Sequence, residues 1–278
     1  MKAPKGLPST MPTDRPVVLG VLNVTPDSFS DGGRFLQIDA AIAHGLDLVR
    51  HGADIVDVGG ESTRPGATGV EPHVEQDRVL PVVRGLVAEG VAISIDTMHA
   101  STAQLAVEQG ACLINDVSGG RFDASMYRTV AALGVPFVLM HWRGFDVRHH
   151  THYDDPVTEV RTEFLEAVER AVDAGVDPST IVMDPGLGFA KDGDTNWVLL
   201  RERVAVAAGY PILVGASRKR FLGELLAQSE ARPIAGRDIA THVISALACD
   251  VWGIRVHDVQ GTRDALAVAQ AMKGNDHG

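Results

Sequence analysis

Residues 92–119 read AISIDTMHASTAQLAVEQGACLINDVSG, and this stretch shows the pattern of the whole chain. A short apolar run, AISIDT, is followed by a segment of helical period that ends at Gly110, and then by a second apolar run, CLINDV. A strand, a helix closed by glycine and another strand form a βαβ unit with parallel strands. The stretch therefore predicts an α/β protein.

The same alternation continues almost to the C-terminus. Further strand candidates lie at 17–24, 54–60, 137–142, 180–188, 211–219 and 254–259. Amphipathic segments lie between the strands, among them 38–51, 75–88 and 157–174, and glycines suited to helix ends are Gly52, Gly90 and Gly175. Eight strands with helices between them favour a single (β/α)8 TIM barrel, although strand counting alone leaves a doubly wound open sheet as a competing topology.

Polar or glycine-rich residues end every predicted strand, and this placement favours the barrel. They are Asn23, 59–61, Asp96, Asn115, Asp116, His141, Asp184, 217–219 and 255–257. In a barrel all these ends meet at one mouth, whereas an open sheet divides them between two halves. We therefore expect the active site at the C-terminal ends of the strands.

The composition limits the possible partners. The chain has 278 residues, 45% of them hydrophobic, with 25 Lys and Arg against 36 Asp and Glu, a formal charge of −11. Because no basic cluster is present, nucleic acid and membrane surfaces are not expected ligands, and no apolar run is long enough to span a bilayer. The two cysteines, Cys112 and Cys249, indicate a reducing compartment, so we expect a cytoplasmic protein.

The domain organisation follows from the same reading. Residues 17–273 contain no stretch of linker composition and are expected to form one domain. Residues 1–16 are rich in Pro, Gly, Ser and Thr and are expected to be a flexible tail, as are residues 274–278. The segments 25–35 and 61–72 are unusually long loops, of the kind that covers a barrel mouth.

A cationic group is predicted at the last two strands. Arg255 and His257 are two residues apart, so they share one face of a strand. Ser217, Arg218 and Lys219 end the preceding strand and lead into a helix, where barrels often hold phosphate. The alternative is that these cations only pair with surface acids. Their convergence at one mouth favours phosphate binding.

An acidic and amide group is predicted at three other strands. Asp96 and Asp184 offer paired carboxylate oxygens, and Asn115 offers a donor and an acceptor, which together suit a flat heterocycle with amide and amino edges. The alternative for each aspartate is a helix N-cap, which Asp96 could provide for the segment that follows it. The sequence has no metal-ligand spacing of the EF-hand type, and the His-rich stretch 148–155 is interpreted as a solvated loop, so a metal would arrive with substrate phosphate.

Eight ordered blocks carry a resemblance to a known family. They are GVLNVTPDSFSDGG from Gly20, DIVDVGGESTRPGA from Asp54, SIDT from Ser94, INDVSGG from Ile114, VLMHWRG from Val138, DPGLGFAK from Asp184, LVGASRKRFLG from Leu213 and RVHDV from Arg255. The chain thereby resembles the bacterial dihydropteroate synthases, a pterin-binding family. The resemblance implies a (β/α)8 barrel, a homodimer and a sulfonamide target. It also implies condensation of 6-hydroxymethyl-7,8-dihydropterin pyrophosphate with p-aminobenzoate, with Mg²⁺, to give 7,8-dihydropteroate and pyrophosphate in folate synthesis.

The resemblance also implies roles for individual residues. Pterin contacts would be Asp96, Asn115, Met140, Asp184, Gly215 and Lys219. p-Aminobenzoate would be enclosed by Phe29, Thr63, Pro65, Phe189 and Lys219. Pyrophosphate would be held by Asn23, Arg64, Arg255 and His257, with Asn23 nearest the Mg²⁺. The residues expected to take part in catalysis are Asp31, Arg64, Lys219, Arg255 and His257.

A mechanism follows from the chemistry of these substrates. An arylamine is neutral at pH 7 and needs little general-base help, so the departing pyrophosphate is what must be stabilised. We predict a dissociative substitution, with Asp31 adding negative charge near a cationic methylene carbon and both long loops closing after the pterin pyrophosphate binds. Arg220 stands where many family members have serine, which leaves the contact to the p-aminobenzoate carboxylate open.

Two other functions are alternatives to the synthase. A pterin-binding methyltransferase that uses methyltetrahydrofolate would share Asp96, Asn115 and Asp184 but would have no use for a pyrophosphate clamp. A non-catalytic paralogue that binds pterin would be expected to have lost clamp or loop residues, and none is missing from the sequence.

Overall fold

The computed structural model describes residues 2–25, 34–61, 69–144 and 152–273, and in this part of the chain eight parallel strands form one sheet. They are β1 (Val17–Asn23), β2 (Ile55–Gly59), β3 (Ile93–Asp96), β4 (Leu113–Asp116), β5 (Phe137–Met140), β6 (Ile181–Asp184), β7 (Leu213–Val214) and β8 (Gly253–Val256). The order is β6-β5-β4-β3-β2-β1-β8-β7, and a bridge between Met183 and Ile212 joins the two ends. This nearly closed barrel confirms the (β/α)8 fold over the open sheet.

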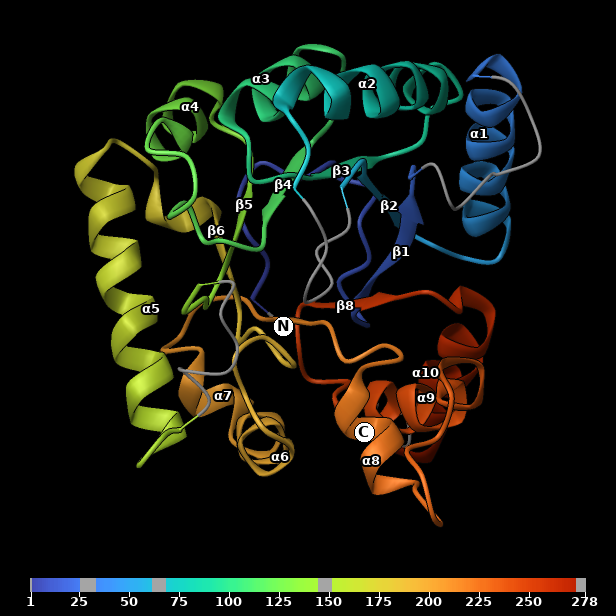
Figure 1. The fold of residues 1–278 in the computed structure, drawn as a ribbon, viewed down its shortest axis with the longest axis vertical. Coiled ribbons are helices and arrows are strands. Elements are labelled where there is room, and N and C mark those ends of the chain that lie inside the picture. Colours follow the sequence, from blue (N-terminus) through green and yellow to red (C-terminus); the bar gives the residue numbers. More distant parts are fainter. Residues whose placement is uncertain (1, 26–33, 62–68, 145–151, 274–278) are drawn as a thin grey trace, which may run out of the picture.

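The helices form an outer ring around the strands (Figure 1). They are α1 (Arg34–Arg50), α2 (Pro72–Ala88), α3 (Ala100–Glu108), α4 (Met126–Leu133), α5 (Pro156–Asp173), α6 (Gly193–Arg201), α7 (Arg203–Val206), α8 (Arg220–Leu225), α9 (Asp238–Leu247) and α10 (Val259–Lys273). The glycines expected at helix ends have positive φ: 101° at Gly52, 77° at Gly90, 106° at Gly110 and 100° at Gly175. That left-handed conformation suits glycine and ends each helix, as predicted.

The strand after α7 is much shorter than the sequence suggests. Residues 211–219 are predicted as one strand, but β7 is only Leu213–Val214. Beyond Val214 the chain turns, the N–H of Lys219 donates to the carbonyl of Ala216 at 3.2 Å, and Arg218 has φ 58°. The apolar composition of this run therefore reflects burial and not strand pairing along its whole length.

Successive side chains of each strand point alternately into the barrel and toward the helices, so the barrel interior consists of layers. One buried cluster fills the barrel and includes Leu19, Ile55, Leu113, Val182 and Leu213. The residues between them belong to a larger cluster under the helices. Two positions further along the same strands stand Asp57, Asn115, Asp184 and Gly215. The apolar layer therefore lies below the mouth, and the next interior layer toward the strands' C-terminal ends contains these three polar residues and Gly215, with Val21 on β1.

The N-terminal segment lies against the lower end of this interior. Leu7 and Met11 pack against the interior cluster, and the N–H of Lys5 donates to the carbonyl of Ser179 at 2.9 Å. Arg15 pairs with Asp54 through two 2.7 Å bonds. These contacts cover the end of the barrel opposite the mouth. The domain limits, including a tail at 1–16, stay a prediction.

Replacing Leu7 and Met11 with serine is expected to lower the free energy of unfolding by about 2 kcal/mol, because two half-buried apolar side chains leave the interior cluster. Chemical denaturation measures the change. The exposed pair Thr10 and Thr13, replaced by alanine, is the matched control and should leave stability unchanged. Equal effects of the two double substitutions would show that the segment does not support the barrel.

In the part of the chain that the structure covers, no helix is both long enough and apolar enough to cross a membrane.

Candidate active site

A row of polar and small residues crosses four neighbouring strands at the mouth. In the register of the sheet, Asn23 on β1 lies beside Gly59 on β2, Gly59 beside Asp96 on β3, and Asp96 beside Asn115 on β4. Because the pairing is parallel, these ends meet on one rim. A Cβ on Gly59 would lie 3.4 Å from the Asp96 side chain, so glycine keeps the rim open beside that carboxyl.

Arg255 on β8 extends across the barrel to this row. Its Nε donates to Asp57 Oδ2 at 2.6 Å and one terminal nitrogen donates to Asp96 Oδ2 at 2.6 Å. Asn115 Nδ2 also donates to Asp57 Oδ2, at 3.1 Å. One guanidinium is therefore shared by two buried carboxyls, a geometry that arginine's rigid fork permits.

Burial dominates the ionisation of these groups. It raises the pKa of Asp96 to about 7, opposed by Arg255 and reinforced by the neighbouring Asp57. Burial opposes the charge of Arg255, but Asp57 and Asp96 outweigh it and raise the pKa of that guanidinium. The second oxygens, Oδ1 of Asp57 and of Asp96, are buried and accept no hydrogen bond from the described residues. Such acceptors are satisfied when a ligand brings N–H donors.

Asp57 is a site residue that sequence reasoning missed. It lies in the block DIVDVGG, and its side chain is fully buried in the barrel. The available signal was a charged residue in the middle of an otherwise apolar strand, which is costly without a partner. Its partner, Arg255, is 198 residues away in sequence, so no local pattern identifies the pair.

Asp184 and Lys219 form the other side of the mouth around Gly215. A Cβ on Gly215 would lie 3.6 Å from Asp184 Oδ2 and 4.0 Å from Lys219 Nζ, so glycine leaves a narrow space between the two groups. Burial raises the pKa of Asp184, with Lys219 opposing it. Burial lowers the pKa of Lys219 to about 8, with Asp184 opposing it. At neutral pH the Lys219 side chain is therefore mostly in its protonated, ammonium form and can bind an anion or a carbonyl.

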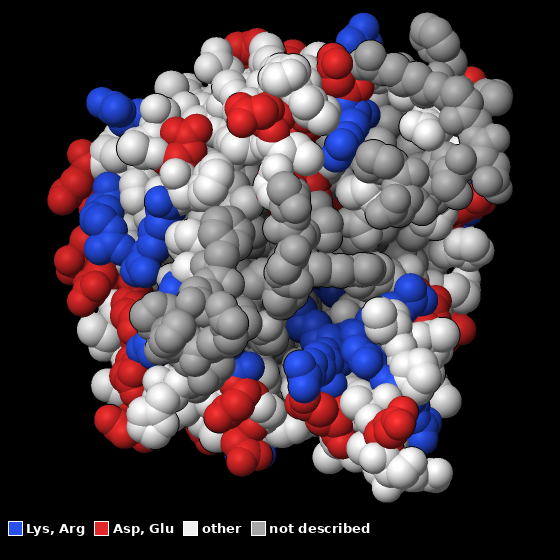
Figure 2. Space-filling model, in the orientation of Figure 1, with Lys and Arg blue, Asp and Glu red and all other residues white. Residues whose placement is uncertain are grey.

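The cationic residues after β7 have separate positions. Ser217 Oγ lies 3.0 Å from His257 Nδ1, and the N–H of His257 donates to Ser217 Oγ at 3.2 Å, which fixes the histidine at the end of β8. Arg218 instead pairs with Asp238 at 2.7 and 2.9 Å, so for this residue the surface-acid alternative holds. Arg220, an exposed side chain at the start of α8, pairs with Glu224 at 2.7 Å. Lys and Arg side chains gather over α8 in Figure 2.

An apolar wall completes the described part of the mouth. Met98, Val117 and Met140 form a small buried cluster, against which Trp142 and Phe189 pack. The ring of Phe189 also lies 4.8 Å from Lys219 Nζ, a cation–π contact. Flat aromatic ligands bind well beside such a wall.

The structure brings the described candidates to one mouth. They are Asn23, Asp96, Asn115, Met140, Asp184, Phe189, Gly215, Lys219, Arg255 and His257. The candidates Phe29, Asp31, Thr63, Arg64 and Pro65 lie outside the described residues. Asp96 is not a helix cap, because α3 begins after His99 and the N–H of Ala100 donates to Asp123 at 2.9 Å.

Comparison with known proteins agrees with this geometry. The model of a family described as pterin binding enzyme matches residues 19–257. The dihydropteroate synthase of Mycobacterium leprae is 55% identical over 262 residues, covering 91% of this chain and 92% of that protein. Two structures of the Xanthomonas albilineans dihydropteroate synthase are also similar. One, with 4-aminobenzoic acid, has TM-score 0.86, 43% identity and coverage of 94% of each chain. The other, with 7,8-dihydropteroate, has TM-score 0.84, 40% identity and coverage of 95% and 96%.

The chain therefore belongs to the pterin binding enzyme family. Its relatives at high identity and coverage are transferases of folate synthesis. Within the family, the chain is an enzyme of the dihydropteroate synthase type.

Proposed function

We propose that the enzyme condenses 6-hydroxymethyl-7,8-dihydropterin pyrophosphate with p-aminobenzoate to give 7,8-dihydropteroate and pyrophosphate. The observation that carries the proposal is the position of Arg255, between Asp57 and Asp96 on a rim that also holds Asp184 and Lys219. A cation for a leaving diphosphate thus stands beside acceptors for a pterin ring.

The pterin is proposed to bind in the slot between Asp96, Asn115 and Asp184, with Gly215 leaving room for the ring. Its amino and ring N–H groups are donors, which suit the buried carboxyl oxygens of Asp96 and Asp184. Lys219 would donate to a ring carbonyl or ring nitrogen, and Met140 would contact the ring face. The pterin-binding relatives and the complex of one relative with 7,8-dihydropteroate support this assignment.

The pyrophosphate is proposed to lie toward β8 and β1, near Arg255, His257, Asn23 and Arg64. No three acid, histidine or cysteine side chains of the described chain are grouped as a metal site. Asn23 offers one amide oxygen, and Mg²⁺ is commonly held by one or two protein oxygens plus substrate phosphates, so the residues fit an ion that arrives on the pyrophosphate. Bound there, Mg²⁺ would neutralise charge on the leaving group.

The p-aminobenzoate is proposed to bind between Phe189, the stem of Lys219 and residues of the two long loops, namely Phe29, Thr63 and Pro65. The C–O bond to pyrophosphate breaks ahead of attack, the neutral amine then bonds to the cationic methylene carbon, and the amine nitrogen loses one proton to solvent. Arg64, Arg255 and His257 hold the departing charge, and Asp31 stabilises the cationic carbon.

A pyrophosphate-release assay tests the proposed function. With dihydropterin pyrophosphate, p-aminobenzoate and Mg²⁺ together, release is expected and should fall on omission of either the arylamine or the metal. A sulfonamide, as an arylamine analogue, is expected to compete with p-aminobenzoate. Release that is independent of the arylamine would show that the enzyme is not a synthase of this type.

We also propose that the enzyme is a cytoplasmic homodimer. The two cysteines of the chain, Cys112 and Cys249, form no disulfide, which fits a reducing compartment. An apolar stripe of exposed side chains runs along α9 and α10, which pack together. Its members are Ile239, Val243, Leu247, Val268 and Met272. Stripes of this kind mark subunit interfaces.

Replacing Val243 and Leu247 on α9 with glutamate is expected to give a monomer. The two side chains are 52% and 71% exposed, so their replacement leaves the barrel core intact while putting charge on the stripe. Analytical ultracentrifugation measures the mass. Val172→Glu, at a 41% exposed apolar position on α5, is the matched control and should stay dimeric. A dimer that survives the double substitution would place the interface elsewhere.

A further inference from the structure

The segment 185–190, between β6 and α6, shapes one side of the mouth. The N–H of Gly186 donates to Asp184 Oδ1 at 2.7 Å, and the carbonyl of Leu187 accepts from Lys219 Nζ. The ring of Phe189 lies 4.8 Å from that same ammonium. The backbone position of this segment therefore fixes both ionisable groups beside the pterin slot and the aromatic wall next to them.

The backbone of this segment turns sharply through three residues with positive φ. Gly186, Gly188 and Ala190 have φ of 66°, 76° and 47°, all in the left-handed region that an alanine rarely adopts. A Cβ on Gly186 would lie 2.2 Å from the carbonyl oxygen of His141, so the segment lies directly against the end of β5. Glycine adopts positive φ readily, so the strained position is Ala190, whose conformation persists only where surrounding contacts hold it.

Lys191 supplies those contacts from beneath the segment. Its Nζ lies 3.0 Å from the carbonyl oxygens of Gly186 and Phe189 and 3.0 Å from Nδ1 of His141. An ammonium has three N–H donors, and these three acceptors use all of them. The side chain is 8% exposed. One buried cation thus holds both ends of the turn that carries Leu187 and Phe189.

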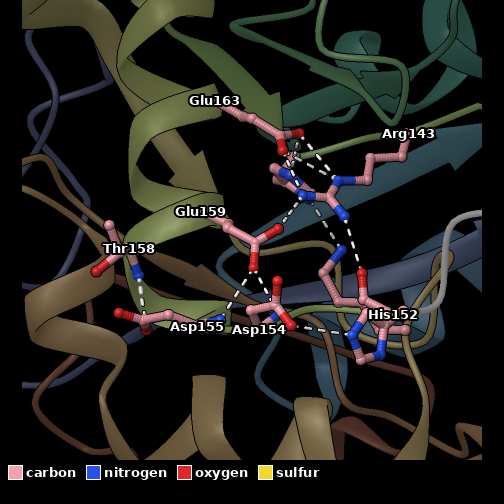
Figure 3. Close-up of polar contacts among 9 residues, drawn as sticks. Arg143, His152, Asp154, Asp155, Thr158, Glu159 and Glu163 are labelled. Atoms are coloured by element: carbon pink, nitrogen blue, oxygen red, sulfur yellow. Dashed lines mark hydrogen bonds and ion pairs between the residues drawn. The ribbon is translucent and has the colours of Figure 1, made fainter.

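The orientation of His141 is fixed from its other side. Burial lowers the pKa of His141 to about 3, so the imidazole is neutral, and since Nδ1 accepts from Lys191, Nε2–H donates to Glu163 Oε2 at 3.0 Å. Glu163 on α5 also accepts from Arg143 Nε at 3.0 Å, and Arg143 donates to Glu159 at 2.8 Å. Figure 3 shows Arg143 between these two glutamates. The hydrogen bonds fix the tautomer that lets His141 face the ammonium.

This arrangement is costly if it serves only to fill space. Burying an ammonium among neutral acceptors is unfavourable, and burial lowers the pKa of Lys191 to about 7. An apolar side chain of similar volume would pack there without that cost. It would not hold the two carbonyls that set the turn.

We propose that Lys191 is a positioning residue for the arylamine side of the site, acting through the carbonyls of Gly186 and Phe189. The inference rests on the proposed condensation, because it concerns the wall assigned to p-aminobenzoate. Two proposed pterin contacts, Asp184 and Lys219, also bind to this segment, but Asp96 and Asn115, on β3 and β4, make no contact with it among those described. Phe189 belongs to the segment itself, so arylamine binding is expected to depend on Lys191 more than pterin binding does. Loss of Lys191 is therefore expected to raise KM for p-aminobenzoate more than KM for the pterin pyrophosphate.

The test compares Lys191→Met with Arg15→Met in steady-state kinetics. Lys191→Met removes all three donors at nearly constant volume and is expected to raise KM for p-aminobenzoate at least about tenfold, with KM for the pterin pyrophosphate and kcat within about threefold. Arg15→Met also removes a mostly buried cation with several hydrogen bonds, but at the opposite end of the barrel. It should leave both KM values unchanged even where it lowers the melting temperature.

A rescue experiment separates positioning from general damage. In Lys191→Ala, added propylamine is expected to lower KM for p-aminobenzoate toward the wild-type value, because a free ammonium can occupy the space and donate to the same carbonyls. An unchanged arylamine KM in Lys191→Met, or an equal rise in both KM values without rescue, would overturn the proposal. Should Lys191→Met not fold, Lys191→Ala without propylamine is measured instead, and an unchanged arylamine KM there also overturns it. Turnover by the wild-type enzyme tests the proposed function separately, since it does not depend on how the two KM values change in the Lys191 variants.

Discussion

Arg255→Ala is expected to lower kcat/KM by about 10³-fold, the size of effect seen when a charge-stabilising group is removed from an active site. Arg255 is the guanidinium shared by Asp57 and Asp96, so its loss removes one of the cations of the proposed pyrophosphate site. It also leaves two buried carboxyls facing each other. Steady-state kinetics measures the loss, and near wild-type activity would exclude Arg255 from the mechanism.

The same substitution is expected to change how stability depends on pH. Burial already raises the folded-state pKa of Asp96 to about 7, and Arg255 is the main group that opposes the rise. Without it the folded pKa rises further above the unfolded value. A carboxyl of this kind stabilises the fold below the unfolded pKa and loses that contribution as the pH rises through the folded pKa. Between the unfolded pKa and about pH 7 both proteins lose this contribution at the same rate, so the deficit of Arg255→Ala relative to wild type should grow above about pH 7 in thermal unfolding, where only the variant's Asp96 is still protonated. Arg15→Ala, which separates Arg15 from Asp54, is the control and should leave kcat/KM unchanged.

Asp96→Asn is expected to weaken pterin binding by about 10²-fold to 10³-fold while making the folded protein more stable at pH 8. The carboxylate is the proposed acceptor of two pterin N–H bonds, and an amide offers one acceptor and one ill-placed donor. Calorimetric titration with a pterin measures the affinity. Unchanged affinity would show that the pterin does not contact Asp96.

The stability part of this prediction follows from the pKa of Asp96. It is raised by burial from 3.8 to about 7, so ionising Asp96 in the fold at pH 8 costs about 4 kcal/mol at most. Asparagine carries no such cost, and the melting temperature should rise by several degrees at pH 8 but not at pH 4. Asp54→Asn at the base of the barrel is the matched control, which should lose stability through Arg15 and keep pterin affinity. A lower melting temperature for Asp96→Asn at pH 8 would contradict this reasoning.

The barrel and its mouth were predictable because both depend on local periodicity. The interior alternation, the glycines after the helices and the polar residue at the end of each strand are all readable along the chain, so Asp96, Asn115, Asp184 and Arg255 were expected on one rim and lie there. The resemblance to a family added roles that periodicity does not supply.

Other features depend on contacts between distant segments, and the sequence does not show them. The buried carboxylate of Asp57 is explained by its ion pair with Arg255. The buried side chain of Lys191 is explained in part by its hydrogen bond with His141, which lies beside it in the fold. Arg218 was grouped with Lys219 because the two are adjacent, but positive φ at Arg218 turns its side chain to Asp238. Adjacent positions in this turn therefore place Lys219 at the mouth and Arg218 in a pair with a surface acid.

The join between β6 and β7 has a consequence for how the molecule opens. Only the bridge from Met183 to Ile212 joins these strands, while the other neighbouring pairs share longer ladders. Local opening of the barrel should begin with separation of β6 from β7, so backbone amide hydrogen exchange at these two strands should be faster than elsewhere in the sheet. Asp184 ends β6, and Lys219 follows β7 on the other side of this junction. A molecule bound to both residues would therefore link the two strands where the barrel has its shortest ladder.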